Sequence, residues 1–250
     1  MSFSEIWSNG FFLNMIMQME KNAGFYIAMA IGFLFFAILI PYLCGSINSA
    51  VIISRLLYHD DVRNHGSGNA GMTNMLRTYG KGAAGLTLLG DLLKTALAIA
   101  AASLTMSSGF GGWIACLFCV MGHIFPVFHH FKGGKGVLCT AVGILILHPP
   151  AFLLAFVTFV ILVAATRYVS LGSVVSAMLL PLYIDRINSF LLQQAAEAGR
   201  EEAISFGLGG LISVILAVII LWCHRANLGR IMRREESKLS FKKKKKDDET

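Results

Sequence analysis

Long apolar runs are the feature of this sequence that most restricts its fold. Charged residues make up only 14% of its 250 residues, whereas an ordinary soluble domain has about 25%. A helix that crosses a membrane needs about 20 predominantly apolar residues. Seven apolar runs are present, at residues 25–44, 83–104, 112–128, 137–147, 151–166, 171–184 and 205–223. The sequence therefore predicts an all-α polytopic membrane protein with seven transmembrane helices.

Two of these runs, 137–147 and 171–184, are short for a membrane span. We expect flanking residues to extend them, or the helices to be tilted or partly re-entrant. The break between the fourth and fifth runs is firm, because a helix does not continue through His148-Pro149-Pro150.

We expect three segments along the chain. Residues 1–24 are an N-terminal extension in which residues 11–19, FFLNMIMQM, have the Phe/Met face of a short interfacial helix. Residues 25–236 are the seven-helix membrane domain. Residues 237–250 form a lysine-rich tail that lacks an apolar face, and we expect this tail to be disordered in the cytoplasm.

The distribution of Lys and Arg predicts the orientation in the membrane. With the N-terminus outside, the inside segments hold 17 of the 21 Lys and Arg residues and the outside segments hold three. The remaining one, Lys94, lies within the second run. We therefore expect the N-terminus outside and the C-terminus inside.

Polar residues gather in the predicted inside loops, and the first loop is the richest. Its glycines at 66, 68 and 71 alternate with hydroxyl, amide and guanidinium side chains. These are Ser67, Asn69, Thr73, Asn74 and Arg77. The G-x-G-x-x-G pattern does not predict a dinucleotide site, because that motif needs a preceding strand within a βαβ unit. Exposed main-chain N–H groups beside these side chains favour an anion, most naturally a phosphate.

The second inside loop, HHFKGGKGV at residues 129–137, is also typical of phosphate binding. Its candidate ligands are Lys132, Gly133, Gly134, Lys135 and Gly136. A helix that begins after this loop would point its N-terminus at a bound anion. The loop is not a Walker A motif, because glycine follows the lysine where that motif has Ser or Thr. His129 and His130 have no third ligand at helical spacing, so we expect no metal site.

Two further inside segments carry polar side chains. One is RYVSLGS at residues 167–173, which contains Ser170. The other is HRANLGRIMRREE at residues 224–236, in which His224 and Asn227 lie three residues apart and share one face of a continuing helix.

Asp91 and Lys94 lie three residues apart within the second apolar run, so they can pair across one helical turn. A single unpaired charge in hydrocarbon would cost several kcal/mol. We expect an ion pair near the inner end of the bundle, with a mainly structural role.

Nucleic-acid binding and thiol chemistry are both disfavoured. The net charge is +7, but the 18 Phe residues lie mostly inside apolar runs rather than between basic residues, as base stacking would need. Cys116 and Cys119 form a C-x-x-C pair within the apolar run WIACLFCVMG. A redox or zinc site needs polar neighbours or a second ligand pair, so we interpret them as packing residues.

Taken together, the motifs resemble the bacterial acyl-phosphate:glycerol-3-phosphate acyltransferase family, PlsY. The segments that carry the resemblance are GSGNAGMTNMLRTYG (66–80), GDLLKT (90–95), GHIFPVFHHFKGGKGV (122–137), RYVSLGS (167–173) and HRANLGRI (224–231). The chain departs from the family's pattern at Asn48, where proline is usual, and at Met72 and Leu138, where small residues are usual. Arg234-Glu235-Glu236 stands where the family has Gly-Thr-Glu.

The resemblance implies transfer of a fatty acyl group from acyl phosphate to the 1-hydroxyl of glycerol 3-phosphate. The products would be lysophosphatidic acid and phosphate, with no cofactor. The implied catalytic residues are Ser67, Arg77, Lys135, His224 and Asn227. The expected substrate-binding residues are Asn69, Thr73, Asn74, Lys132, Gly133, Gly134, Gly136 and Ser170. Other implied partners are membrane lipids and an enzyme that makes acyl phosphate, with the active site on the cytoplasmic face of the bacterial inner (plasma) membrane.

The sequence lacks a His-x4-Asp acyltransferase motif. We therefore expect the phosphate of the donor to take the hydroxyl proton, with catalysis mainly by positioning and by neutralising the leaving phosphate. The main alternative is a membrane transporter for small phosphorylated solutes. Transporters usually have a site at mid-membrane and internal repeats, whereas these polar clusters lie at one face. A non-catalytic scaffold is a further alternative, and it would show no turnover.

The orientation can be tested with a single cysteine at Ala198, on a background that lacks the five native cysteines. We expect an impermeant maleimide to label it in intact cells, because Ala198 falls in a predicted outside loop. Labelling that requires permeabilised membranes would contradict this orientation.

Overall fold

The computed structural model describes residues 23–105, 108–197 and 206–239, and every regular element in this part of the chain is helical. The α-helices are α3 (Ala23–Ser46), α4 (Ser49–Tyr58), α5 (Met72–Thr78), α6 (Lys81–Thr105), α7 (Ser108–Ile124), α8 (Val137–Leu147), α9 (Pro149–Thr166), α10 (Val169–Glu197), α11 (Phe206–Cys223) and α12 (Arg225–Met232). Two 3-10 turns are η1 (Val62–Asn64) and η2 (Val127–His129). The predicted interfacial helix at 11–19 and residues 240–250 of the predicted tail lie outside the described residues.

Apolar helices form at all seven predicted runs, but their lengths differ. Within the described residues, five helices are long and apolar enough to cross a membrane, and α11 with α12, bent by 54°, makes a sixth if the pair counts as one span. α10 extends beyond the predicted 171–184 run to 29 residues. α8 keeps only 11 residues. At 1.5 Å per residue α8 measures about 17 Å, roughly half the hydrocarbon thickness.

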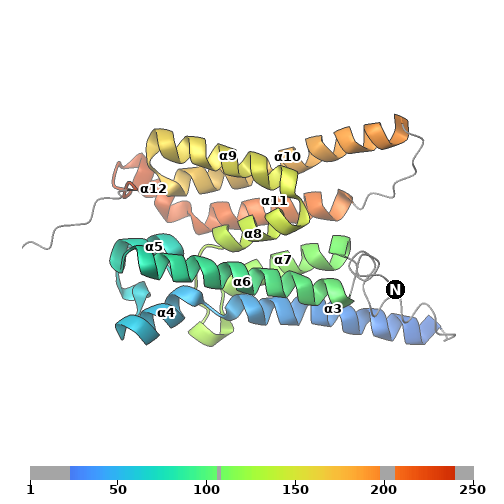
Figure 1. The fold of residues 1–250 in the computed structure, drawn as a ribbon, viewed down its shortest axis with the longest axis horizontal. Helices are drawn as coiled ribbons and strands as arrows, with labels where there is room; N and C mark the ends of the chain where they lie inside the picture. Colours follow the sequence, from blue (N-terminus) through green and yellow to red (C-terminus); the bar gives the residue numbers. More distant parts are fainter. Residues whose placement is uncertain (1–22, 106–107, 198–205, 240–250) are drawn as a thin grey trace, which may run out of the picture.

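The helices form two groups, which are joined by α8 and by a direct contact between α7 and α11. α3, α6 and α7 pack against one another, and α10 packs against both α9 and α11. α8 lies in the middle of the molecule and contacts α6 and α7 on one side and α9 on the other (Figure 1). The short helices α4, α5 and α12 gather at the left-hand end in Figure 1. The polar loops that precede or follow these helices therefore meet at one end of the bundle.

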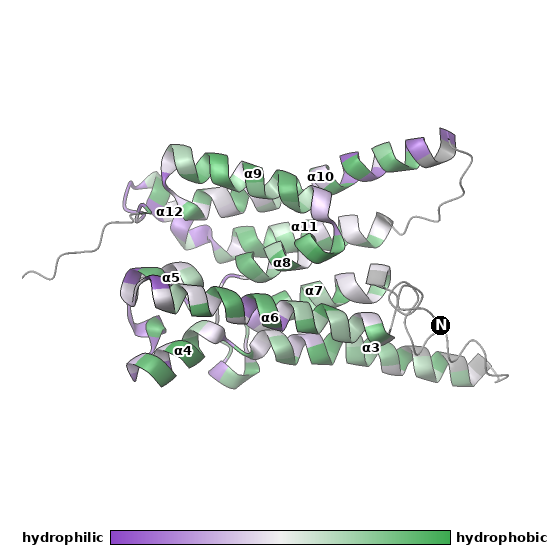
Figure 2. Cartoon of the chain, in the orientation of Figure 1, coloured by the Kyte–Doolittle hydropathy of each residue, from purple (hydrophilic) through white to green (hydrophobic). Residues whose placement is uncertain are grey.

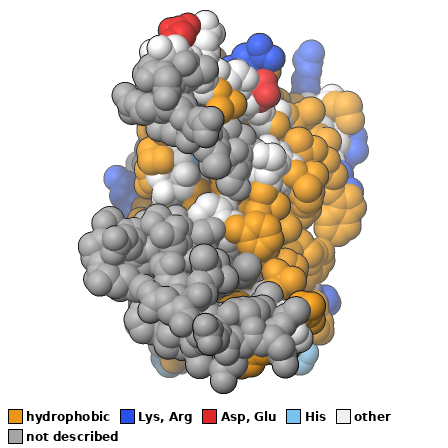
Figure 3. Space-filling model, turned by 90° about the vertical axis from the view of Figure 1, so that its right-hand side faces the viewer, with side chains coloured by type: hydrophobic (Ala, Val, Ile, Leu, Met, Phe, Trp, Pro, Cys, Tyr) orange, Lys and Arg blue, Asp and Glu red, His pale blue; other side chains and the backbone are white. Residues whose placement is uncertain are grey.

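Hydrophobic side chains cover the outside of the helices, as a lipid environment requires. Figure 2 shows hydrophobic residues along the long helices and hydrophilic residues at the left-hand end and at the far end of α10. In Figure 3, which views the opposite end, hydrophobic side chains cover the right-hand flank. Large exposed hydrophobic residues on α9 include Leu153, Phe156 and Ile161. This distribution fits an integral membrane protein.

The start of α4 depends on Asn48, where the related family usually has proline. The Asn48 side chain caps the helix by accepting a hydrogen bond from the Val51 N–H at 3.1 Å. Its amide nitrogen lies 3.4 Å from the Ala70 carbonyl oxygen. Asn48 therefore stabilises α4 and links its first turn to the glycine-rich loop before α5.

α3 and α7 approach each other backbone to backbone. A Cβ atom at Gly45 would lie 2.1 Å from the Cys119 carbonyl oxygen. A Cβ atom at Gly122 would lie 2.1 Å from the Tyr42 carbonyl oxygen. Glycine fits so close an approach, and small residues commonly line helix contacts in membranes. This contact fixes where α3 and α7 cross, just before each helix ends and the polypeptide turns towards the polar loops.

We predict that Gly122→Ala lowers the melting temperature in detergent, because the added methyl group would overlap the Tyr42 carbonyl. Overpacking of this kind typically costs about 1–3 kcal/mol of unfolding free energy. Gly85→Ala is the matched control, because a Cβ atom at Gly85 on α6 meets nothing within 4 Å. It should leave the melting temperature unchanged or slightly raised. Equal melting temperatures for the two variants would contradict the close contact.

Candidate functional site

A cavity of about 390 Å³ lies between the two groups of helices. Ten of the thirteen predicted site residues line it. They are Ser67, Asn69, Thr73, Asn74, Arg77, Lys135, Gly136, Ser170, His224 and Asn227. The apolar part of the lining includes Leu138 and Ile144 from α8, Phe152 and Phe156 from α9, and Leu180 from α10. The cavity therefore joins a polar end, formed by loops, to an apolar wall formed by helices.

Asn74 holds the first glycine-rich loop in shape. It is almost fully buried, and its Oδ1 accepts a hydrogen bond from the Ser67 N–H at 3.1 Å. Its amide nitrogen donates to the carbonyls of Val62 and His65, at 3.0 and 2.9 Å. Gly66 adopts φ +58°, and a Cβ atom there would lie 2.3 Å from Asn74 Oδ1. Because its hydrogen bonds go to the main chain, we interpret Asn74 as a residue that positions Ser67.

Arg77 lies in the last turn of α5, at the exposed rim of the cavity. Its Nη2 donates a hydrogen bond to the Ser237 carbonyl at 3.2 Å. Leu239 N–H donates to the Arg167 carbonyl at 2.8 Å. Residues 237–239, the start of the predicted tail, thus lie against α5 and the α9–α10 turn.

The second glycine-rich loop folds back onto the end of α7. Gly133 N–H donates to the Ile124 carbonyl at 3.1 Å, and Gly134 N–H donates to the His123 carbonyl at 3.0 Å. A Cβ atom at Gly133 would lie 2.0 Å from the His123 carbonyl oxygen. The two glycines permit this close packing, and their N–H groups are already engaged. Gly133 and Gly134 do not line the cavity. Phosphate binding by their main-chain N–H groups therefore stays a prediction, and the observed hydrogen bonds disfavour it.

Lys132 and Lys135 have different environments. Lys132 is exposed and does not line the cavity, and its carbonyl accepts a hydrogen bond from Arg63 Nη1 at 3.0 Å. Lys135 is partly buried, lines the cavity, and donates a hydrogen bond through Nζ to Asn227 Oδ1. Burial lowers the pKa of Lys135 to about 8, although the nearby Glu236 carboxylate opposes this shift. Lys135 is therefore the lysine of this loop that can meet a bound anion.

Glu236 organises the polar groups around α12. Its Oε1 accepts hydrogen bonds from Asn227 Nδ2 at 2.6 Å and from Ser170 Oγ at 2.5 Å. Its Oε2 accepts from Arg230 Nε at 2.7 Å. Burial raises the pKa of this carboxyl, but the three hydrogen bonds outweigh burial and leave the pKa lowered. The ionised Glu236 thus fixes Ser170 and Asn227 at the cavity wall.

His224 lies at the bend between α11 and α12 and is 3% exposed. Its Nδ1 lies 2.8 Å from the Ile220 carbonyl oxygen. A carbonyl can only accept, so Nδ1 carries the proton of this hydrogen bond. In the neutral ring, Nε2 is then an acceptor, and His224 lines the cavity.

The cavity also contains residues outside the predicted set, notably Asp91, His123 and Glu236. The predicted Asp91–Lys94 ion pair is confirmed, with 2.8 Å between Asp91 Oδ1 and Lys94 Nζ. Its extension to His123 was not predicted, because His123 stands alone in an apolar run. Met72 and Leu138, two of the departures from the family pattern, also line the cavity.

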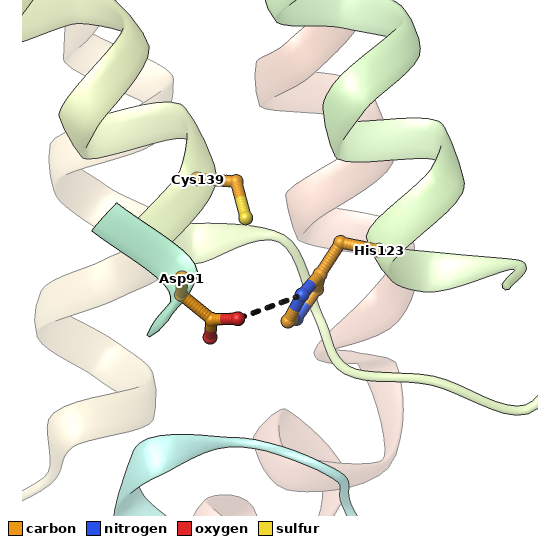
Figure 4. Close-up of side chains that lie close together, drawn as sticks. All are labelled: Asp91, His123 and Cys139. Atoms are coloured by element: carbon orange, nitrogen blue, oxygen red, sulfur yellow. Dashed lines mark ion pairs between the residues drawn. The ribbon is translucent and has the colours of Figure 1, made fainter. Parts of the chain in front are cut away.

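Asp91, His123 and Cys139 come together from α6, α7 and α8 (Figure 4). Their ligand atoms all lie within 4.8 Å of one another, a spacing that could hold a metal ion. Lys94 Nζ, however, lies 2.8 Å from Asp91 Oδ1 and 2.9 Å from His123 Nδ1. The ammonium therefore already occupies the position of a cation between these two groups, and we interpret the cluster as a structural ion pair.

The fold and the cavity define a class: a helical membrane protein whose cavity offers hydrogen-bonding and cationic groups at one end and an apolar wall at the other. The profile of the family described as glycerol-3-phosphate acyltransferase matches residues 35–234. The chain belongs to this family, the PlsY family of membrane acyltransferases, as its motifs predicted. Membership favours an enzyme of phospholipid synthesis over the transporter and the scaffold.

The similar proteins cover most of the chain. The glycerol-3-phosphate acyltransferase of Thioalkalivibrio sulfidiphilus is 40% identical over 210 residues, which span 83% of this chain and 94% of that relative. That of Halorhodospira halophila is 38% identical over 203 residues, or 81% and 94% of the two chains.

Two solved structures are also similar. Both are crystal structures of PlsY, described as an integral membrane glycerol 3-phosphate acyltransferase. The glycerol 3-phosphate form has a TM-score of 0.67 and 29% identity, and the match covers 83% of this chain and 96% of that one. The lysophosphatidic acid form has a TM-score of 0.64 and 27% identity, with 83% and 95% coverage.

We predict that Arg77→Lys keeps the charge but loses about 10- to 100-fold in turnover, close to the loss in Arg77→Ala. A guanidinium can hold two phosphate oxygens at once, and hydrogen bonds to charged groups are worth about 1.5–3 kcal/mol. The measurement is turnover against glycerol 3-phosphate concentration, with thermal stability in detergent as the check on folding. Near-normal turnover of Arg77→Lys would instead identify Arg77 as an interface anchor.

Proposed function

We propose that this chain transfers a fatty acyl group from acyl phosphate to the 1-hydroxyl of glycerol 3-phosphate, giving lysophosphatidic acid and phosphate. The observation that carries the proposal is the cavity that joins polar and apolar linings. Both substrates carry phosphate, and the donor also carries a hydrocarbon chain. The similar PlsY structures in glycerol 3-phosphate and lysophosphatidic acid forms support the acceptor and the product.

The polar end suits the two phosphates. Arg77 and Lys135 supply positive charge from the two glycine-rich segments, and Ser67 and Asn69 supply hydrogen-bonding groups between them. Val137 begins α8 directly after Gly136, so the N-terminus of this helix adds partial positive charge beside the cavity. The two phosphates thus have separate cationic groups, Arg77 at the rim and Lys135 deeper.

The apolar wall suits the acyl chain. Phe152, Phe156 and Phe159 of α9 face Leu88 of α6 and Leu180 of α10 around the same cavity. The outer side of α9 also carries exposed large apolar side chains, so this helix is apolar both towards the cavity and towards the outside of the molecule. Transfer of each methylene from water to such surroundings is worth about 0.8 kcal/mol.

The reaction needs two contributions from the protein: it must position the two substrates and neutralise the negative charge of their phosphates. The 1-hydroxyl oxygen attacks the carbonyl carbon, and the bond from that carbon to the phosphate oxygen breaks. The phosphate leaves with the bonding electrons and takes the hydroxyl proton. His224 Nε2 is an acceptor that can orient the glycerol hydroxyl. Lys135 neutralises the leaving phosphate, and Arg77 holds the phosphate of glycerol 3-phosphate.

We further propose seven crossings with the N-terminus outside and the cavity's polar end at the cytoplasmic face of the bacterial inner membrane. The gathering of α4, α5 and α12 at one end, with the basic loops beside them, supports this orientation (Figure 1). The seventh crossing would be the short α8, tilted or extended by the residues that flank it. An enzyme that makes acyl phosphate would supply the donor, and no cofactor or metal enters the proposed reaction.

The donor can be tested with the purified full-length protein and labelled glycerol 3-phosphate. Acyl phosphate, acyl-CoA and acyl carrier protein are supplied separately, with and without EDTA. We expect lysophosphatidic acid from acyl phosphate alone, at the same rate in EDTA. Product from acyl-CoA would contradict the proposed donor, and loss of activity in EDTA that magnesium or zinc restores would contradict metal-free chemistry.

We also predict that kcat/KM for the donor falls as the pH rises through about 8. Lys135, with a pKa of about 8, is charged below this value and loses its proton above it. In Lys135→Arg this decline should disappear, because a guanidinium stays protonated. Thermal stability across the same pH range is the control. A decline that is unchanged in Lys135→Arg would assign it to another group.

A further inference from the structure

In the described part of the structure, two residues of the cavity wall carry buried hydroxyl groups that have no hydrogen-bond partner. Thr140 on α8 is 5% exposed and Ser176 on α10 is 8% exposed, and both line the cavity. Within the part of the chain that the structure describes, neither Oγ atom has a hydrogen-bond partner. Buried polar groups are normally paired, so an unpaired hydroxyl at a cavity wall points to a ligand atom that pairs with it.

A main-chain carbonyl of the same helix could accept a hydrogen bond from each of these hydroxyls, but in the described structure neither hydroxyl donates to one. Thr87, Thr95 and Ser173 each donate a hydrogen bond to the carbonyl four residues earlier, at 2.8, 2.8 and 2.9 Å. Such back-bonding is the usual way for Ser and Thr to be satisfied inside a helix. Thr140 and Ser176 remain free to bond across the cavity.

Along their helices, both residues lie between a residue of the polar end of the cavity and a large apolar residue of its wall. Along α8, Thr140 lies one helical turn after Gly136 and one turn before Ile144. Along α10, Ser176 follows Ser173 and precedes Leu180, again by about one turn each. A ligand group at this level lies between the phosphate end and the hydrocarbon wall.

We infer that Thr140 and Ser176 donate hydrogen bonds to the carbonyl oxygen of the acyl group. This inference rests on the proposed function. In an acyl donor, the carbonyl oxygen is the strong acceptor between the phosphate and the hydrocarbon chain. The position of this oxygen within the donor therefore corresponds to the position of Thr140 and Ser176 between the polar end and the apolar wall of the cavity.

The same hydrogen bonds would act on the reacting atoms. When the 1-hydroxyl oxygen of glycerol 3-phosphate forms its bond to the carbonyl carbon, the carbonyl π electrons move onto the carbonyl oxygen. The carbonyl bond re-forms as the bond to the phosphate oxygen breaks, and the phosphate leaves with that electron pair and the hydroxyl proton. Donors at the oxygen where negative charge develops stabilise this transition state more than the ground state.

The first experiment compares Thr140→Val, Ser176→Ala and Thr140→Ser. The first two remove one hydroxyl each, and the third keeps the hydroxyl. Loss of one such donor typically lowers kcat on the order of 10²- to 10³-fold. We expect a loss of kcat in Thr140→Val and Ser176→Ala, an unchanged KM for glycerol 3-phosphate, and near-normal kcat in Thr140→Ser.

Ser103→Ala is the matched control. Ser103 on α6 is also fully buried with an unpaired hydroxyl in the described structure, but it does not line the cavity. Its removal should leave kcat unchanged. Normal kcat in both Thr140→Val and Ser176→Ala, or an equal loss in Ser103→Ala, would overturn the inference.

A second experiment is independent of turnover and of the donor. Lysophosphatidic acid labelled with ¹³C at its ester carbonyl is bound to the full-length protein, and its carbonyl stretch is recorded by infrared difference spectroscopy. We expect a lower wavenumber in the wild type than in detergent alone, and the detergent value in the Thr140→Val, Ser176→Ala double variant. The same band in wild type and double variant would overturn the inference. If acyl phosphate fails as donor but the band shift is present, the proposed donor fails and the carbonyl site stands.

Discussion

The buried ammonium of Lys94 determines how α3, α6 and α7 meet. Lys94 is 5% exposed, and beside its ion pair with Asp91 and its contact with His123 it donates to the carbonyls of Gly45 and Ile47, at 3.2 and 2.9 Å. A charge within the hydrocarbon costs several kcal/mol unless it is partnered. The end of α3, the middle of α6 and the end of α7 must therefore stay close to this single nitrogen. The Gly45 and Gly122 contacts make that closeness sterically feasible.

The placement of Lys135 follows from this cluster through a continuous series of contacts. The carbonyl of His123 accepts the N–H of Gly134, which turns the loop back and presents Lys135 to the cavity. Lys135 bonds to Asn227, which Glu236 holds in turn. In this series of contacts, His123 belongs to the first group of helices, whereas Asn227 and Glu236 lie at the end of the second group. Site geometry therefore depends on both groups and on the short α8 between them.

The sequence predicted the helices and most of the polar residues of the inside loops that line the cavity, because apolar length and clustered polar loops are local properties. It did not predict what the glycines of the second loop do. A G-G-K-G sequence looks the same whether its N–H groups face an anion or, as at Gly133 and Gly134, the end of another helix. Asn74 was predicted as a ligand for a similar reason, whereas its amide is engaged by main-chain groups up to twelve residues away. Glu236 stands at the glutamate of the family's Gly-Thr-Glu, but Arg234-Glu235 replaces the two residues before it. With that context changed, the sequence did not identify the carboxylate as a site residue, and its hydrogen-bond partners do.

The presence of the Glu236 carboxylate in a cavity that we propose to bind phosphates has a physical explanation. Coulomb attraction between an ammonium and a phosphate grows as the effective dielectric falls, so a bound phosphate is attracted more strongly by a buried lysine than by an exposed one. The same burial disfavours the charged ammonium, and this is why the pKa of Lys135 is lowered. The Glu236 carboxylate opposes that loss, and its own charge is kept by the hydrogen bonds from Ser170, Asn227 and Arg230. The carboxylate therefore weakens the net positive field slightly but keeps the deeper cation charged, and without it the lysine would be neutral over more of the neutral pH range.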